Sequence, residues 1–154
     1  MCHQLSKIVS WVAVFVWMTI IFYLSHQPVI VSNGLSAGLA EVIVQKVEST
    51  AANHVLNVDS VNHIMRKSAH FFMYFVLGLF VINIIRKCGV AHYRGFGLAL
   101  LICGVYALCD EVHQFFIEGR GPQLKDVLID SAGAFVGISL FCFTKLMLRR
   151  QRVS

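Results

Sequence analysis

The sequence predicts an all-α, polytopic membrane protein: a single domain over residues 1–154 that forms a bundle of four transmembrane helices. Hydrophobic residues make up 57% of the chain and charged residues only 14%. That composition is too apolar for an ordinary soluble domain. Four stretches also approach the roughly 20 apolar residues that a bilayer-crossing helix needs. We expect the spans at about residues 8–25, 68–86, 95–116 and 126–148.

The first span is expected to be a retained anchor. It follows Lys7, as the apolar core of a signal peptide would, but no small-x-small cleavage site follows it closely. Pro28 prevents easy continuation of the helix. We therefore assign this span a packing role only.

An outer loop, residues 26–67, connects the first two spans. Apolar residues recur at helical spacing between Leu35 and Val47, opposite Glu41, Gln45 and Glu48. This pattern predicts a short amphipathic helix on the outer membrane surface. The segment could be a lid over a site, but a surface-resting connector is the interpretation we favour. Further on, Asp59 and Ser60 predict the N-cap of a helix that runs to Lys87.

A polar stripe descends into the second span. Lys67, His70 and Tyr74 follow one another at spacings of three and four, which places them on one helical face, with Arg66 at its edge. Arg66 and Lys67 could simply extend towards lipid phosphates. His70 and Tyr74 are deeper, so lipid-facing placement would leave their polar atoms unpaired, and we expect both to point inward.

The segment from Asp110 to Gly133 holds five of the eight carboxylates: Asp110, Glu111, Glu118, Asp126 and Asp130. On the third span, Asp110, His113 and Gln114 share one predicted face, with Glu111 beside them. A Gly-Arg-Gly-Pro turn presents Arg120 before the fourth span begins.

The fourth span carries a second stripe, on which Asp126 and Asp130 precede Gly133 and Gly137 at helical spacing. The two glycines permit a close helix contact, although that pattern alone is weak. Asp126 could merely cap the helix. Asp130 lies a turn further in and is harder to explain as a cap.

Basic residues predict the orientation. With four spans, one side of the membrane receives eight Lys and Arg residues and no carboxylate, and the other receives five with all eight carboxylates. The positive-inside rule then places both termini in the cytoplasm of a plasma (inner) membrane protein and turns the acidic segment outward. The net charge of +5 is thus a topology signal, and no motif indicates nucleic acid as a partner.

These polar groups predict a site at the outer leaflet. The candidate catalytic residues are Asp110, Glu111, His70 and Tyr74, because carboxyl and imidazole groups in a partly dry site suit general acid–base chemistry. The candidate binding residues are Lys67, Arg66, Gln114, His113, Arg120, Asp126 and Asp130. Their cations suit an anionic partner, a membrane lipid or a lipid-linked headgroup with phosphate or diphosphate.

Two other interpretations of the same residues stay open. The charges could form a buried network that only fixes helix packing, with Lys67 or Arg120 paired to an acid. Asp110 and His113 could also chelate a metal, but no H-E-x-x-H or paired-cysteine motif is present, so we assign no metal ligand and no cofactor. The five cysteines predict no disulfide framework, and the oligomeric state is left open.

The ordered motifs resemble the VanZ-like membrane protein family. They are Arg66-Lys67-Ser-Ala-His70 with Tyr74, Asp110-Glu111-x-His113-Gln114, Gly119-Arg120, Asp126, Asp130 and Gly133-x-x-x-Gly137. The chain departs from the family at Glu118, where proline often precedes Gly-Arg. The resemblance implies that the functional residues are Lys67, His70, Tyr74, Asp110, Glu111, Gln114, Arg120, Asp126 and Asp130.

The family's namesake confers low-level resistance to the glycopeptide teicoplanin, so the resemblance implies work at the external face, where cell-wall precursors are exposed. Three hypotheses follow for this chain. It is a membrane enzyme that acts on a lipid-linked or cell-envelope substrate, a non-catalytic binder of an envelope lipid or glycopeptide, or a purely structural membrane protein.

Overall fold

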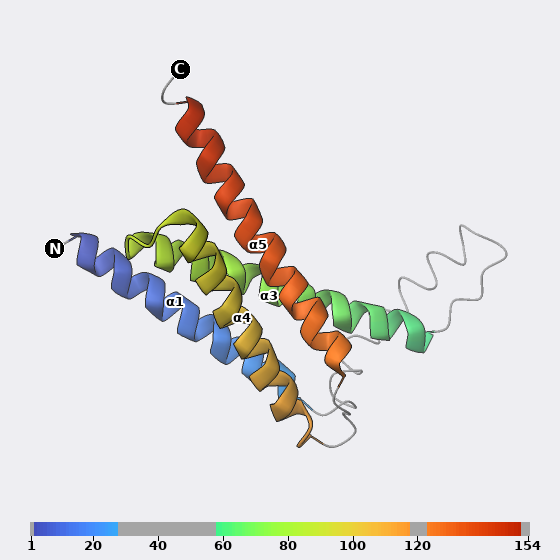
Figure 1. The fold of residues 1–154 in the computed structure, drawn as a ribbon. Helices are drawn as coiled ribbons and strands as arrows, with labels where there is room; N and C mark the ends of the chain where they lie inside the picture. Colours follow the sequence, from blue (N-terminus) through green and yellow to red (C-terminus); the bar gives the residue numbers. More distant parts are fainter. Residues whose placement is uncertain (1, 28–57, 118–122, 152–154) are drawn as a thin grey trace.

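The computed structural model describes residues 2–27, 58–117 and 123–151. Within these ranges the chain forms four α-helices and no strand: α1 (Cys2–Ser25), α3 (Val58–Lys87), α4 (His92–Gln114) and α5 (Leu124–Gln151) (Figure 1). Each of them contains a segment long and apolar enough to cross a membrane. The all-α class and the four predicted helices are therefore confirmed.

The helix ends differ from the predicted spans. α1 begins at Cys2 and α5 continues to Gln151, because a helix needs no apolar side chains to continue its backbone hydrogen bonds past the hydrocarbon. α4 ends at Gln114. α3 already includes Val58, so Asp59 and Ser60 lie inside the helix and not before it. The predicted amphipathic segment at residues 35–47 lies outside the described residues.

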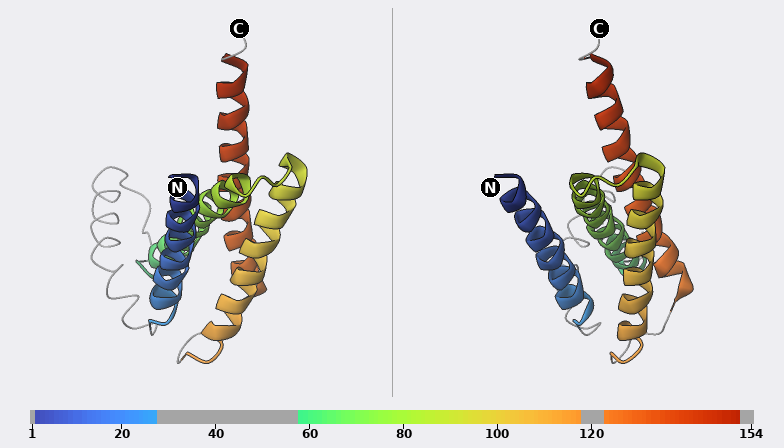
Figure 2. Two further views of the ribbon diagram at one scale, coloured as in Figure 1. Left: turned by 90° about the vertical axis from the view of Figure 1, so that its left-hand side faces the viewer. Right: turned by 60° about the vertical axis from the view of Figure 1, so that its left-hand side comes forward.

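α3 is the central helix, since it contacts each of the other three and packs most extensively on α5. α1 lies along α3 and contacts α4 at few positions, which places it at the side of the bundle (Figure 2). The C-terminal turns of α5 extend beyond the other helices (Figure 1). The core therefore lies around α3, between α4 and α5.

Glycines allow α3 and α5 to meet backbone to backbone. A Cβ atom at Gly133 or Gly137 would collide with the carbonyl oxygens of Phe71 and Phe75, respectively. Gly78 of α3 faces α5 in the same way, with its missing Cβ only 2.6 Å from a backbone oxygen. Such small residues let transmembrane helices approach closely. The close helix contact predicted from Gly133-x-x-x-Gly137 is confirmed.

α4 approaches the bundle along a row of small residues. The row contains Gly95, Ala99, Cys103 and Ala107, which recur every four residues and are all buried. Residues four apart lie on one face of a helix, so the row continues towards Asp110 and Glu111 at its end. The packing face of α4 therefore delivers these two acids to the interior.

Side-chain hydrogen bonds attach α1 to its neighbours. Trp17 donates its indole N–H to the Met73 carbonyl oxygen at 2.9 Å, and the Tyr106 hydroxyl donates to the Met18 carbonyl oxygen at 2.7 Å. At the far end, Lys87 Nζ donates to Ser10 Oγ at 2.7 Å. Interhelical hydrogen bonds of this kind stabilise membrane bundles, so α1 is fixed in rotation as well as in position.

We expect Gly137→Ala to destabilise the bundle by about 1–3 kcal/mol, because the added methyl group overpacks a backbone contact. Gly97→Ala is the matched control, since a Cβ there meets no atom within 4 Å. Both changes gain the same helix propensity, about 1 kcal/mol in favour of alanine. Unfolding in mixed detergent micelles measures the difference. Equal stability of the two variants would contradict the backbone contact.

Candidate functional site

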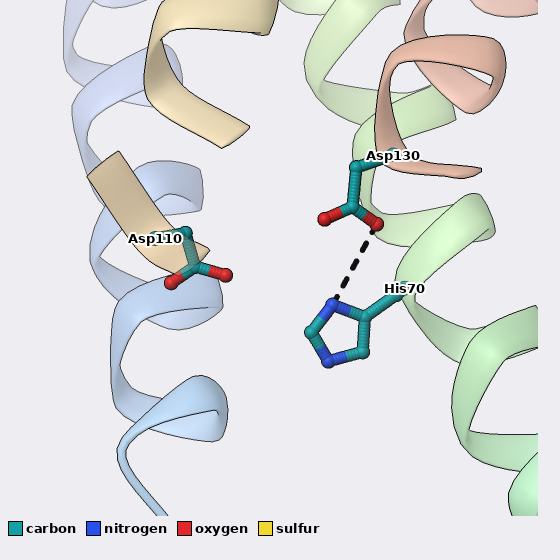
Figure 3. A group of neighbouring side chains, drawn as sticks. All are labelled: His70, Asp110 and Asp130. Atoms are coloured by element: carbon teal, nitrogen blue, oxygen red, sulfur yellow. Dashed lines mark ion pairs between the residues drawn. The ribbon is translucent and has the colours of Figure 1, made fainter. Parts of the chain in front are cut away.

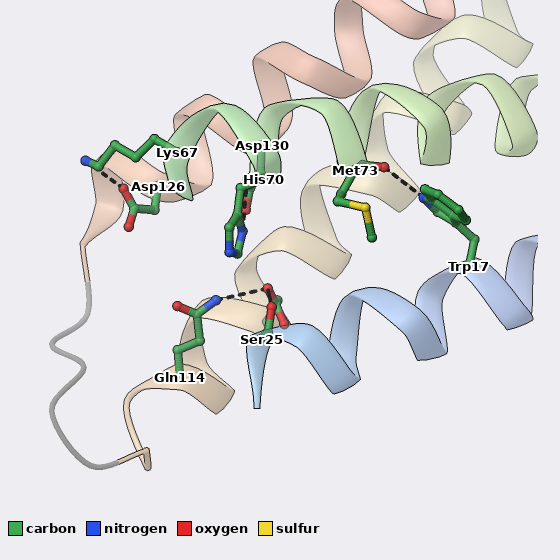
Figure 4. Close-up of polar contacts among 9 residues, drawn as sticks. Trp17, Ser25, Lys67, His70, Met73, Gln114, Asp126 and Asp130 are labelled. Carbon is green, nitrogen blue, oxygen red and sulfur yellow. Dashed lines mark hydrogen bonds and ion pairs between the residues drawn. The ribbon is translucent and has the colours of Figure 1, made fainter. Parts of the chain in front are cut away.

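Polar side chains from all four helices meet at one end of the bundle, which we call the polar end. It is formed by the C-terminal ends of α1 and α4 and the N-terminal parts of α3 and α5, and it carries Ser25, Lys67, His70, Asp110, Gln114, Asp126 and Asp130 (Figure 4). The sequence predicted this convergence for α3, α4 and α5. The contribution of α1 was not predicted.

His70, Asp110 and Asp130 form the centre of the polar end, and we call these three residues the His70 cluster. They come from α3, α4 and α5, and their side chains point towards one another (Figure 3). One nitrogen or oxygen atom of each lies within 4.8 Å of those of the other two. His70 Nδ1 lies 3.7 Å from Asp130 Oδ1. Asp110 and Asp130 are each only 3% exposed.

Two neighbours hold Asp110 through the same oxygen. The Ser25 hydroxyl donates to Asp110 Oδ2 at 2.8 Å, and Gln114 Nε2 donates to it at 3.1 Å (Figure 4). Asp110 Oδ1 is buried and accepts no hydrogen bond from the part of the chain that the structure describes, and the same holds for Asp130 Oδ1. Buried carboxylate oxygens without a partner are costly and call for an explanation.

Tyr74 lies one turn deeper on α3 and is completely buried. Its hydroxyl group makes no hydrogen bond to any described residue. The inward placement predicted for this side chain agrees with its burial. The Tyr74 hydroxyl is thus another buried polar atom without a hydrogen bond to a described residue, one turn from His70 along α3.

The rim of the polar end carries an ion pair and an anchored turn. Lys67 Nζ lies 3.0 Å from Asp126 Oδ1, and both side chains are about one quarter exposed, at 22% and 26%. Glu111 accepts a hydrogen bond from the backbone N–H of Gln123, just before α5. Asp126 therefore pairs with Lys67 rather than acting only as a cap, and Glu111 links α4 to the residue that precedes α5.

Some predicted site residues point elsewhere. His113 faces α1: its Nε2 atom lies 3.1 Å from Nδ1 of His26, and its ring lies 4.3 Å from that of Phe22. Asp110 and His113 therefore do not form the chelating pair considered from the sequence. Arg66 contacts His63 at 3.5 Å. Arg120 and Glu118 lie outside the described residues.

Ser25 belongs to the candidate site and was missed by the sequence analysis. It is 1% exposed and donates directly to a cluster carboxylate. A signal was present, because Ser25 is one of the few polar residues in the apolar part of α1 and lies at the end of the helix. Such a residue at membrane depth normally needs a partner on another helix.

An apolar groove lies beside the polar end, on α3 and α5. It encloses about 290 Å³ and is lined by Ile64, Lys67, Ser68, Phe71, Phe72 and Ile129. Lys67 is therefore shared between this groove and the ion pair with Asp126. A cation beside an apolar groove is complementary to a lipid that has an anionic headgroup and an apolar chain.

The arrangement brings two carboxyl groups, one imidazole, one phenol and one ammonium group into or beside a mostly dry space. These groups can exchange protons, accept hydrogen bonds from a ligand or hold a cation. Histidine and aspartate are also common metal ligands. The described residues thus support a binding or acid–base site, and the sequence prediction that His70, Asp110 and Asp130 lie together agrees with the geometry.

Comparison with known proteins places these features in a family. The curated proteins and the solved structures that were compared gave no match. Among protein families, VanZ/LLP1 matches residues 10–147, which include most of the first and fourth apolar spans, all of the two spans between them and every residue of the His70 cluster. The match confirms the resemblance that the sequence motifs indicated. The chain belongs to the VanZ/LLP1 family.

Proposed function

We propose that this protein acts on the polar headgroup of a lipid-linked or cell-envelope precursor at the outer leaflet, with the polar end as its site. One observation carries the proposal: three ionisable side chains from three helices converge inside an apolar bundle, and two of their carboxylate oxygens have no hydrogen-bond partner among the described residues. Ionisable groups in a membrane are costly and are usually kept for a ligand or a proton path.

Asp110 is the better candidate for the general acid or base. Its Oδ1 atom is free to contact a ligand, while Ser25 and Gln114 fix the carboxylate through Oδ2. Glu111, the other candidate, already accepts a hydrogen bond from the Gln123 backbone. A fixed orientation with one free oxygen is what proton transfer to a bound substrate requires.

His70 and Tyr74 are suited to orienting the substrate or relaying protons. His70 lies beside Asp130 and within reach of Asp110, and Tyr74 lies one turn below with a hydroxyl group that has no described partner. Together they connect the two carboxylates to the interior of the bundle. In this proposal neither group performs the chemical step alone.

Lys67 is the group proposed to contact a phosphate. It lies at the mouth of the site and lines the apolar groove, so a lipid with its headgroup at Lys67 can place a chain along Phe71 and Phe72. Its ion pair with Asp126 is about one quarter exposed, and ion pairs that water reaches are weak enough to exchange for a ligand. Arg120 keeps the same predicted role, outside the described residues.

A non-catalytic binder would use the same cation and the same groove. Membership of the family does not decide between the two, and it does not by itself assign glycopeptide resistance, because function depends on the site. The two functions differ in the role of Asp110. In the enzyme Asp110 takes part in the reaction, whereas in the binder it only contacts the bound ligand. That difference is tested below.

The proposal requires the polar end to face outward. We compare two chains that each contain a single cysteine, either Gln123→Cys or the native Cys88. We expect Gln123→Cys to react with a membrane-impermeant maleimide in intact cells. Cys88, exposed at the α3–α4 turn at the opposite end, should react only after the cells are opened. The reverse pattern would place the polar end in the cytoplasm and remove the outer-leaflet function.

The headgroup contact is tested by mass spectrometry of lipids that co-purify with the protein. We expect wild type to retain a phosphorylated lipid above its level in the membrane, and Lys67→Met to retain about tenfold less, the equivalent of one lost charge contact. Lys145→Met removes a cation at the opposite end and is the matched control. Equal lipid retention in all three proteins would contradict a headgroup site.

Asp110→Asn separates the enzyme from the binder in the same measurement. Loss of the acid–base group stops turnover but keeps the size of the side chain, so an enzyme should accumulate bound precursor relative to wild type. A binder should show the same amount or less. The folded state of the variant is verified by its helical circular dichroism and its elution from gel filtration.

A further inference from the structure

We propose that the His70 cluster binds a divalent transition-metal ion, and zinc fits the donor set best. The three side chains offer one imidazole nitrogen and two carboxylate oxygens from three different helices. Zinc takes nitrogen and oxygen ligands of these types, and sites that act on a substrate commonly keep three protein ligands and one open position. Magnesium and calcium prefer oxygen ligands alone, so an imidazole in the set favours a transition metal.

The distances are close to those that such an ion needs. His70 Nδ1 and Asp130 Oδ1 are 3.7 Å apart, and all three ligand atoms lie within 4.8 Å of one another. Two ligands at about 2.1 Å from a tetrahedral zinc ion lie about 3.4 Å apart. Rotation of the carboxylate groups covers the remaining difference, because all three side chains already point into the same space (Figure 3).

The unpartnered oxygen atom of Asp110 is the second, independent observation. Asp110 is only 3% exposed, and its Oδ1 atom accepts no hydrogen bond from a described residue. Asp130 is equally buried, and its Oδ1 atom lies 3.7 Å from His70 Nδ1. Lysine and arginine do not compensate them, since within the described ranges Lys67 pairs with Asp126 and Arg66 contacts His63. A cation between the two carboxylates would remove both the missing contacts and the excess of negative charge.

Ser25 and Gln114 are placed as supporting groups for such an ion. Both donate to Oδ2 of Asp110, which fixes the carboxylate and leaves Oδ1 without a hydrogen bond from a described residue. Metal-binding carboxylates are commonly held by hydrogen bonds of this kind from outside the coordination sphere. The two donors satisfy only Oδ2, so Oδ1 is the oxygen of Asp110 that is available to an ion.

The role of the ion rests on the proposed function, whereas its binding does not. While the ion is bound, Asp110 acts as its ligand, and Glu111 is then the remaining acid–base candidate. A phosphorylated headgroup cannot approach two carboxylates without a positive charge between them. A divalent ion in the His70 cluster would supply that charge, and Lys67 would contact the headgroup from the rim. The substrate class of the site then narrows to phosphorylated lipids.

The His26–His113 pair is the rival metal site at the same end. Two imidazole nitrogens 3.1 Å apart could also hold zinc. This pair belongs to α1 and α4 and contains no carboxylate, so its removal should leave the His70 cluster intact. Removal of this pair therefore tests whether bound zinc depends on His26 and His113 or on the His70 cluster.

Zinc binding is tested on the full chain in detergent, purified with a tag that contains neither histidine nor cysteine. The protein is mixed with an equimolar amount of zinc chloride, passed through gel filtration in metal-free buffer, and measured for zinc per chain by mass spectrometry. Asp110→Asn and Asp130→Asn each remove one ligand charge at constant size. The controls are Asp126→Asn, an acid outside the cluster, and the double variant His26→Ala/His113→Ala.

We expect about one zinc ion per chain in wild type and in both controls, and at least about tenfold less in the two aspartate variants. X-ray absorption of the wild-type zinc complex should show nitrogen and oxygen ligands, one imidazole and no sulfur. This measurement needs no variant, so it decides the matter even where a substitution prevents folding. No retained zinc in wild type, retention in Asp110→Asn and Asp130→Asn at the wild-type level, or a sulfur ligand would overturn the site.

The experiments can contradict the ion site and the proposed function independently of each other. Zinc bound by the cluster together with equal lipid retention in wild type and Lys67→Met would keep the ion site and remove the headgroup function. Lys67-dependent lipid retention without any zinc would keep the headgroup function and remove the ion.

Discussion

The backbone contact between α3 and α5 is the constraint on which the rest of the structure depends. Gly133 and Gly137 lack the atoms that would collide with the carbonyl oxygens of Phe71 and Phe75, so the two helices meet at one register only. His70 immediately precedes Phe71, and Asp130 lies one turn before Gly133. The contact that packs the bundle therefore also sets the imidazole beside the carboxylate, and the fold and the site cannot be separated at this point.

The bundle can tolerate the polar end because the packing of its apolar part does not depend on the polar residues. α4 reaches the interior along small residues, and the core around Leu77 and Ile138 is fully buried. That packing has to outweigh two buried acids, each with one oxygen that accepts no hydrogen bond from a described residue. A site that keeps unpartnered groups while the rest of the protein is well packed is typical of function opposing stability.

Hydropathy was sufficient to predict the four helices, and the spacing of Lys67, His70 and Tyr74 was sufficient to predict their common face. The cost of a polar atom facing lipid indicated an inward side chain for Tyr74, which is completely buried. What the sequence could not provide was the rotation of each helix about its own axis. The membrane-spanning part of α1 has few polar residues, so its pattern indicated that Ser25 needs a partner but not that the partner is Asp110. The same freedom misplaced His113, which the contact with His26 turns towards α1.

The charge balance of the polar end restricts what can bind there. Ionised carboxylates only accept hydrogen bonds, so Asp110 and Asp130 repel a phosphate unless a proton or a cation lies between them. Lys67 supplies one positive charge, but at the rim and already opposite Asp126. His70 lies next to Asp130 and can neutralise one carboxylate when it is protonated. The second carboxylate still requires a donor from outside the described residues, and a headgroup that carries only negative charge does not provide it. A ligand of this site therefore brings its own hydrogen-bond donors, or it arrives together with a cation.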